Sequence, residues 1–159
     1  MVKQPVSVLV VIYTSKLEVL LLERADHPGY WQSVTGSIEI GESLAQTAAR
    51  EVLEETGIDV TQHQLTDCKT QNIYEIYPHW RHRYAPGITH NTEHVFALRL
   101  ADRVTVRLSP REHLNYAWRS WQDSLEQVFS PSNKEAIMRV VAIANSSSNT
   151  KVSQGSFNE

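Results

Sequence analysis

The segment from Ser43 to Gly57 is the part of this 159-residue chain that most restricts its fold. Ser43 and Gln46 have the spacing of a capping box, in which two side chains satisfy backbone amides of a first helical turn. Apolar residues then recur at the spacing of one helix face, at Ala45, Ala48, Ala49 and Val52. Gly57 stands where a left-handed residue ends many helices. The sequence therefore predicts a helix over Leu44–Thr56 that packs one face against another layer.

The rest of the chain alternates between aliphatic runs, which favour strands, and short polar connections. Strands are predicted at Val6–Tyr13, Glu18–Arg24, Trp31–Thr35, Leu65–Tyr77 and Glu93–Arg99, with weaker candidates at Val104–Leu108 and Tyr116–Trp118. Trp80–Gly87 is expected to be a loop, because Pro86-Gly87 favours a turn. Helices are predicted at Trp121–Phe129 and from Ser132, the second burying Ala136, Ile137, Val140, Val141 and Ala144, with Met138 as core filler.

One domain is expected, because no internal repeat or linker divides the chain. It should cover residues 1–145, which is long enough for a single sizeable core. The last segment, residues 146–159, is rich in Ser and Asn and has little to bury. We therefore predict a disordered tail there.

Composition narrows the classes of partner. Apolar residues make up 41% of the chain, which is ordinary for a globular protein. The net charge is −3, so there is no global positive field that would attract nucleic acid. The single cysteine, Cys68, cannot form an intramolecular disulfide. The apolar run at Val6–Ile12 is too short to span a bilayer and lacks a cleavage site. We expect a cytoplasmic protein that binds no membrane.

Glutamates crowd the predicted helix and its approach, at Glu42, Glu51, Glu54 and Glu55. Glu51 and Glu55 are four residues apart and share a face, where like charges weaken a helix by roughly 0.2–0.5 kcal/mol per pair. A cation against that face would offset the repulsion, and carboxylates favour hard ions such as Mg²⁺ or Mn²⁺. Arg50 and Glu54 also have ion-pair spacing. Taken alone, the cluster is more typical of a solvated acidic surface.

Its spacing gives a more specific indication. Gly36, Glu42, Arg50-Glu51-Val52, Glu54-Glu55 and Gly57-Ile58 together resemble the Nudix box at every defining position. The resemblance implies a Nudix hydrolase, with the box as a loop–helix–loop on an α/β/α sandwich whose sheet is mixed. Hydrolysis at a diphosphate link suits the chemistry, because bound metal neutralises phosphate oxygens and activates water.

The same resemblance assigns roles to individual residues. Mg²⁺, with Mn²⁺ as a substitute, would be held by Glu51, Glu54, Glu55, Glu112 and the carbonyl of Gly36. Arg50 would orient a carboxylate, and Glu42 would lie nearby. The catalytic base is left open between Glu51, Glu54 and Glu112.

Cations and aromatic residues gather in the segment His79–Gly87. Arg81 and Arg83 are candidates to receive phosphates, and an aromatic ring is a candidate to stack on a heterocycle. A solvated basic loop is an equal alternative. A zinc site is disfavoured, because the histidine spacing is irregular.

Longer stretches are similar to one branch of the family, the bacterial dihydroneopterin triphosphate pyrophosphohydrolases. They include Pro5–Tyr13, Trp31–Ser37, His79–Gly87, Asn91–Glu93, Glu112–Leu114 and Ser132–Asn133, within a match from about Val2 to Ile143. This similarity implies release of pyrophosphate from dihydroneopterin triphosphate for folate synthesis. It also implies that substrate lies near Lys3, Arg24, Thr35, Tyr74, Glu75, Ile76, Tyr77 and Ser130.

Two other functions are kept open. One is hydrolysis of purine nucleoside triphosphates such as 8-oxo-dGTP or dATP, because guanine and pterin share hydrogen-bonding edges. The other is a catalytically silent Nudix module that binds a nucleotide, which the complete set of box glutamates disfavours. In each case the partner is a small-molecule triphosphate. A homodimer is left open.

Overall fold

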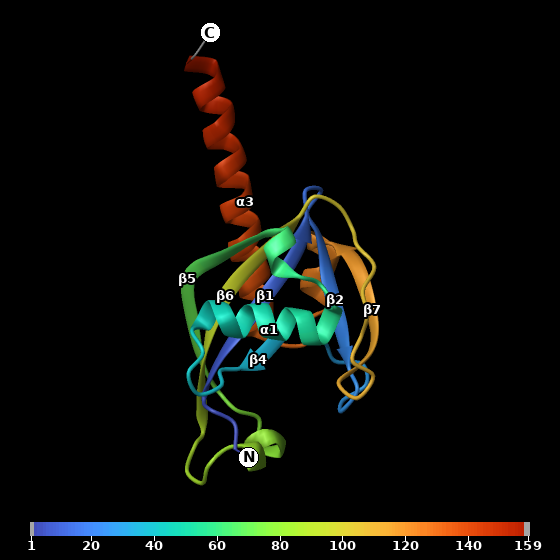
Figure 1. Cartoon of the computed structure of the whole chain (residues 1–159), viewed down its shortest axis with the longest axis vertical. Coiled ribbons are helices and arrows are strands. Elements are labelled where there is room, and N and C mark those ends of the chain that lie inside the picture. The colour runs from blue at the N-terminus through green and yellow to red at the C-terminus, as the bar shows by residue number, and fades with distance from the viewer. Residues whose placement is uncertain (1, 158–159) are drawn as a thin grey trace.

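The computed structural model describes residues 2–157, with side chains described as far as Ser146 (Figure 1). Within these residues, one sheet contains β1 (Val6–Thr14), β2 (Glu18–Arg24), β3 (Trp31–Gln32), β4 (Val34–Ser37), β5 (Gln64–Glu75), β6 (His90–Leu100) and β7 (His113–Ser120). The α-helices are α1 (Leu44–Thr56), α2 (Trp121–Gln127) and α3 (Pro131–Phe157), and two short 3₁₀ helices are η1 (Val60–Gln62) and η2 (Pro78–Arg83).

Strand β1 organises the sheet. It runs parallel to β6 and antiparallel to β4, so Val8 pairs with His94 on one side and with Gly36 on the other. Strand β5 extends the sheet beyond β6, and β2 pairs with β3 and β7. The mixed sheet predicted from the family resemblance is thus confirmed.

The two faces of β1 are buried under different helices. Val8, Val10 and Ile12 belong to a core that includes Ala48 and Val52 of α1. Leu9 and Val11, which point the other way, belong to a second core with Ile137 and Val140 of α3. Because successive side chains of a strand point to opposite faces, this alternation produces three layers, with α1 on one side of the sheet and α3 on the other (Figure 1). The predicted α/β/α sandwich is confirmed.

Helix α1 has the predicted bounds, and its ends are built as expected. The Ser43 side chain accepts from the backbone of Gln46 while the Gln46 side chain accepts from Ser43, and Gly57 ends the helix at φ 75°. The predicted apolar face is only partly correct. Ala48 and Val52 are buried as predicted, but Ala45 is exposed. The buried face also includes Glu55, which is not apolar.

Several other predictions need correction. Val104–Leu108 forms no strand, Ser33 interrupts Trp31–Thr35, and part of the predicted loop at Trp80–Gly87 is the helix η2. Met138 is 46% exposed and is not core filler. The predicted buried face of α3 is otherwise found, with Ala136, Ile137, Val140 and Val141 in the core.

The backbone of α3 continues to Phe157, beyond the start of the predicted tail (Figure 1). Asn158 and Glu159, and the side chains from residue 147 onward, lie outside the described residues. The disorder predicted for residues 146–159 therefore stays a prediction. In the part of the chain that is described, no helix is long and apolar enough to cross a bilayer.

Candidate active site

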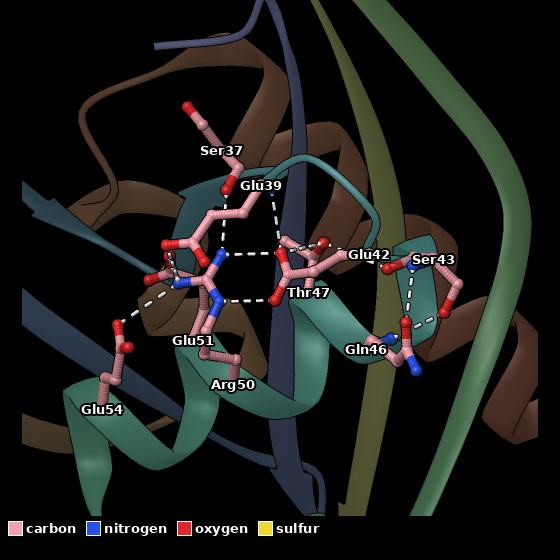
Figure 2. A network of polar contacts seen from close by, with 9 residues as sticks. All are labelled: Ser37, Glu39, Glu42, Ser43, Gln46, Thr47, Arg50, Glu51 and Glu54. Carbon is pink, nitrogen blue, oxygen red and sulfur yellow. Dashed lines mark hydrogen bonds and ion pairs between the residues drawn. The ribbon is translucent and has the colours of Figure 1, made fainter. Parts of the chain in front are cut away.

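Arg50 holds the loop before α1 against the helix (Figure 2). Its Nε donates to Oε2 of Glu42 at 2.6 Å, and its Nη2 donates to Oε1 of Glu42 at 2.9 Å. The same Glu42 carboxylate accepts from the Thr47 hydroxyl and the Glu39 backbone amide, both at 2.9 Å. The hydrogen bonds from Arg50 are the main reason that the pKa of Glu42 falls to about 2. Glu42 is therefore a permanent anion that fixes the loop.

The remaining donors of Arg50 reach the glutamates of the helix. Nη1 donates to Oε1 of Glu51 at 2.7 Å, and Nη2 also donates to the carbonyl of Ser37 at 3.0 Å. The predicted pair with Glu54 exists but is longer, at 3.4 Å, and Glu54 is half exposed. Arg50 thus contacts Glu51 more closely than Glu54.

Gly36 makes room for Glu51. A Cβ atom at position 36 would lie 2.0 Å from Cδ of Glu51 and 2.3 Å from its Oε1, so only glycine allows this carboxylate to lie against strand β4. The pairing of β4 with β1 and the packing of α1 on the same sheet bring the two residues together. The backbone of Gly36 and the Glu51 carboxylate are therefore neighbours, and the role predicted for the Gly36 carbonyl in metal binding stays a prediction.

Glu55 is the most buried acid of the helix, with 2% of its surface exposed. Its Oε2 has no hydrogen-bond partner among the described residues. Burial raises the pKa of Glu55 well above its usual range, and the nearby carboxyl groups of Glu51 and Glu112 raise it further. Burial also raises the pKa of Glu51, despite its contact with Arg50. Both shifts mark a place where negative charge is crowded and poorly solvated.

His113 was not predicted as a site residue, although it follows Glu112. At the start of β7, its Nε2 lies 3.4 Å from Oε1 of Glu55. That distance would suit an ion pair, but burial lowers the pKa of His113 to about 4, so the imidazole is neutral. One ligand atom from each of Glu55, Glu112 and His113 falls within 4.8 Å of the others.

These groups fit a divalent cation. Several carboxylates converge, and one buried carboxylate oxygen is unpaired. Burial, with repulsion from neighbouring carboxyl groups, raises the pKa values of Glu51 and Glu55, and a bound cation would stabilise their negative charge. Oxygen-rich ligand sets favour Mg²⁺ or Mn²⁺ over softer metals. Glu51, Glu55 and Glu112, with the neighbouring backbone of Gly36, are the groups that would hold it. We call these three glutamates the acidic cluster.

Cations face the acidic cluster across a cavity of about 220 Å³. Lys3, Arg24 and Arg83 line it together with Glu55 and Glu112. Arg24 and Arg83 both contact Asp26, at 2.7 and 2.8 Å, whereas Lys3 forms no ion pair within the described residues. Partial desolvation of the Lys3 ammonium, together with repulsion from Arg83 and Arg24, lowers its pKa. Arg111 also lines the cavity, so an anion placed here would meet four cationic side chains.

A second, larger cavity of about 260 Å³ adjoins the first, because Lys3, Arg24, Gln32, Thr35 and Arg83 line both. Its walls include most of the residues predicted to lie near substrate: Thr35, Tyr74, Glu75, Ile76, Tyr77 and Ser130. Arg81 does not line either cavity. Its guanidinium pairs with Glu75 and donates to the carbonyl of Ile76. Of the two arginines proposed for phosphate binding, the structure brings only Arg83 to the cavities.

Aromatic side chains surround the larger cavity; Trp80 falls within the segment predicted to supply a stacking ring, whereas Phe129 was not predicted to contact substrate. The guanidinium carbon of Arg24 lies 4.4 Å from the centroid of the Trp80 ring. The Phe129 ring stacks on the Tyr30 ring, with 4.4 Å between their centroids. Tyr77 meets Trp80 edge-on at 5.4 Å. A wall of this kind suits a flat heterocycle. The aromatic content of His79–Gly87 was the signal for Trp80, whereas Phe129 had none in the sequence.

Comparisons with known proteins agree with this geometry. The NUDIX domain model matches residues 3–140. The chain is 48% identical over 142 residues to dihydroneopterin triphosphate diphosphatase of Escherichia coli, covering 87% of this chain and 93% of that protein. It is 44% identical to the Haemophilus influenzae protein of the same name, covering 84% of this chain and 85% of that protein.

A solved structure of the E. coli dihydroneopterin triphosphate pyrophosphohydrolase superimposes with a TM-score of 0.82 at 47% identity, covering 86% of this chain and 94% of that one. A Nudix protein from Listeria monocytogenes, at 23% identity and a TM-score of 0.73, shares the fold. The family model matches residues 3–140, and the E. coli relative is 48% identical over 93% of its own length. The chain therefore belongs to the Nudix hydrolase family.

Proposed function

We propose that the chain hydrolyses 7,8-dihydroneopterin 3′-triphosphate to the monophosphate and pyrophosphate, with Mg²⁺ as its cofactor and Mn²⁺ as a substitute. The product would serve folate synthesis. The observation that carries the proposal is the continuity of the two cavities: an aromatic-lined cavity opens, past Lys3, Arg24 and Arg83, onto the acidic cluster. The aromatic cavity suits a flat ring, the three cations suit a triphosphate, and the acidic cluster suits a divalent ion, and these surfaces follow one another in that order. The similarity to the E. coli and H. influenzae enzymes supports the choice of ring.

Each part of the site has a separate task in this proposal. The larger cavity binds the ring, with Tyr77 and Trp80 among its walls. Lys3, Arg24 and Arg83 bind phosphate oxygens, and Arg81 only supports the wall by holding Glu75. The acidic cluster holds the ion, with Glu54 at its exposed edge. When bound, a divalent ion neutralises phosphate charge and lowers the pKa of water.

Proton transfer falls to a carboxylate of the acidic cluster or to Glu54 at its exposed edge. A base works best with a pKa near the working pH, and burial raises the pKa of both Glu51 and Glu55. Arg50 keeps Glu51 in one orientation through the 2.7 Å contact. The choice of base remains between Glu51, Glu54 and Glu112, as the sequence left it.

Turnover of dihydroneopterin triphosphate in ¹⁸O-labelled water tests the proposal. We expect pyrophosphate rather than single phosphate, and kcat/KM well above that for dGTP, 8-oxo-dGTP and dATP. Higher efficiency with a purine nucleotide would replace the proposed substrate with the nucleotide-sanitising alternative. Binding of triphosphates without any metal-dependent release of pyrophosphate would indicate a silent module.

Two variants test the site itself. Glu51→Gln and Glu55→Gln keep side-chain volume but remove ligand charge, so we expect kcat to fall by orders of magnitude while the fold persists. Glu126→Gln, on the exposed surface of α2, is the matched control and should behave as wild type. Normal turnover by both site variants at saturating Mg²⁺ would contradict the assignment.

A further inference from the structure

Glu93 is a buried acid that the proposed chemistry does not use. It lies on β6, lines the larger cavity, and has only 3% of its surface exposed. Its Oε1 has no hydrogen-bond partner among the described residues. The Ser132 side chain is the hydrogen-bonding partner of the same carboxyl group. One carboxyl oxygen is thus held by the protein, and the other is left without a donor in the wall of a cavity.

Asn91 contributes a second unpaired acceptor to the wall of the same cavity. Residues two apart on a strand point to the same face, and Asn91 also lines the larger cavity, with 1% of its surface exposed. Its amide group donates to the hydroxyls of Ser7 at 2.7 Å and Tyr74 at 3.1 Å, which leaves its Oδ1 unpaired. Buried polar atoms are almost always hydrogen-bonded in folded proteins, so two unpaired oxygens on one wall indicate a ligand that brings donors.

The chemistry of the wall restricts that ligand. Two acceptors on one wall suit a flat ring that carries two N–H groups on one edge and fits among aromatic side chains. The 2-amino-4-oxo edge of a pterin has this arrangement, with a ring N–H beside an amino group, and guanine presents the same edge. The free oxygen of Glu93 can accept from one of these N–H groups, and the unpaired oxygen of Asn91 is a second acceptor in the same wall.

We propose that Glu93, assisted by Asn91, is the specificity-determining residue that recognises the amino–lactam edge of the substrate ring. This inference rests on the proposed function for the identity of the ring, but it concerns a residue outside the acidic cluster and the phosphate-binding cations.

The ionisation of Glu93 is consistent with this role. Burial raises its pKa to about 7, against a hydrogen bond from Ser132 that lowers it. The groups that face it are the phenols of Tyr74 and Tyr84, whose pKa values are themselves raised by burial and by the Glu93 charge. Within the described residues Glu93 forms no ion pair, although Lys3, Arg24 and Arg83 line the same cavity. A ligand that donates a hydrogen bond to the carboxylate would favour its ionised form.

A substrate pair that differs by one amino group tests the proposal. dGTP carries the amino group and dITP lacks it, while their triphosphates are identical. We expect wild type to prefer dGTP in kcat/KM, and Glu93→Gln to reduce that preference by about 10- to 100-fold, the usual value of a hydrogen bond to a charged group. Glu93→Asp, which keeps the charge but withdraws it by one methylene, should fall between them. An unchanged dGTP-to-dITP ratio in Glu93→Gln would overturn the proposal.

Binding of unphosphorylated 7,8-dihydroneopterin to the metal-free protein gives a readout without catalysis. Titration calorimetry should show at least about 10-fold weaker binding to Glu93→Gln than to wild type, and no change in the control Glu126→Gln. Circular dichroism and the melting temperature verify that each variant is folded. Equal binding by wild type and Glu93→Gln would refute the role of Glu93.

The two proposals fail separately. If wild type does not hydrolyse dihydroneopterin triphosphate but the ring still binds through Glu93, the proposed function falls and the recognition stands. If the triphosphate is hydrolysed and neither assay depends on Glu93, the recognition falls and the proposed function stands.

Discussion

Asn133 and Ser33 hold each other by two hydrogen bonds although they are 100 residues apart in the chain. Oδ1 of Asn133, near the start of α3, accepts from the backbone amide of Ser33 at 2.8 Å, and its Nδ2 donates to the Ser33 hydroxyl at 3.0 Å. Ser33 separates β3 from β4, the strand that carries Gly36. Because the Asn133 side chain is 1% exposed, water does not substitute for it.

Asn133→Ala should therefore destabilise the protein by about 1–3 kcal/mol, the cost of leaving a buried donor unsatisfied. The matched control is Asn115→Ala, whose side chain donates to Glu23 on the exposed surface and should change stability by no more than about 0.5 kcal/mol. Urea unfolding measures both. Equal stability of the two variants would mean that the Asn133 contacts contribute nothing beyond a surface pair.

Gly36→Ala tests the close approach of Glu51 to β4. The new methyl group would meet Cδ and Oε1 of Glu51, so the carboxylate has to move. We expect affinity for Mg²⁺ to fall by about 10- to 100-fold, as for other changes that misplace a metal ligand, with kcat falling in parallel. Calorimetric titration of Mg²⁺ or Mn²⁺ measures the effect.

Gly29→Ala separates this effect from a general backbone effect. Nothing lies within 4 Å of a Cβ atom at position 29, but φ there is +92°. That variant should lose about 1–2 kcal/mol of stability through strain and bind metal as wild type does. Wild-type metal affinity in Gly36→Ala would show that Glu51 is not a ligand.

The parts of the site that follow from local sequence were predictable. Glu42, Arg50 and Glu51 lie on one loop and the helix that follows it, so fixed spacing sets their relative positions. The exception is Glu55, which helical periodicity assigned to an acidic face. Whether a helix residue faces solvent or a neighbouring layer depends on that layer, and here β7 brings His113 to within 3.4 Å of Glu55.

Residues brought together by the sheet were harder to predict. Asn91, Glu93 and Val95 are alternate residues of β6 and are all buried. Polar residues at the inward positions of a strand are therefore the sequence signal for this part of the site. Conversely, Val104–Leu108 alternates like a strand, and Val106 is buried. Its backbone bonds elsewhere, since Arg107 N donates to the carbonyl of Thr56 at the end of α1. The alternation of apolar residues in Val104–Leu108 predicted correctly that Val106 is buried, but it did not predict that the backbone bonds to the end of α1 rather than to a strand.

Arg50→Lys tests whether the guanidinium works as a multidentate clamp. Lysine keeps the charge but cannot bond Glu42 through two nitrogens while reaching Glu51 and the Ser37 carbonyl. We expect kcat to fall by about 10- to 100-fold, because the orientation of a metal ligand is lost. Arg103→Lys, at an exposed pair with Glu18, is the control and should change kcat by less than about twofold. Full activity of Arg50→Lys would reduce the role of Arg50 to its charge.

The raised pKa of Glu93 makes a prediction about stability and pH. The carboxyl titrates near 4.5 in the unfolded chain and near 7 in the folded protein. The folded state therefore binds more protons than the unfolded chain between these two pH values. The contribution of Glu93 to stability is fully present below pH 4.5 and is lost as the pH rises through 7. A shift of this size corresponds to about 3 kcal/mol of unfolding free energy.

Glu93→Gln removes the titration, so the stability of the variant relative to metal-free wild type should rise between pH 4.5 and 8. Other carboxyl groups cancel in the difference, and the phenols of Tyr74 and Tyr84 titrate above this window because burial raises their pKa values. Urea unfolding of both proteins at four pH values measures the trend. If the unfolding free energies of the two proteins change in parallel with pH, Glu93 ionises in the folded protein as it does in the unfolded chain. A carboxylate that ionises so easily would not need hydrogen-bond donors from a ligand to stabilise its charge.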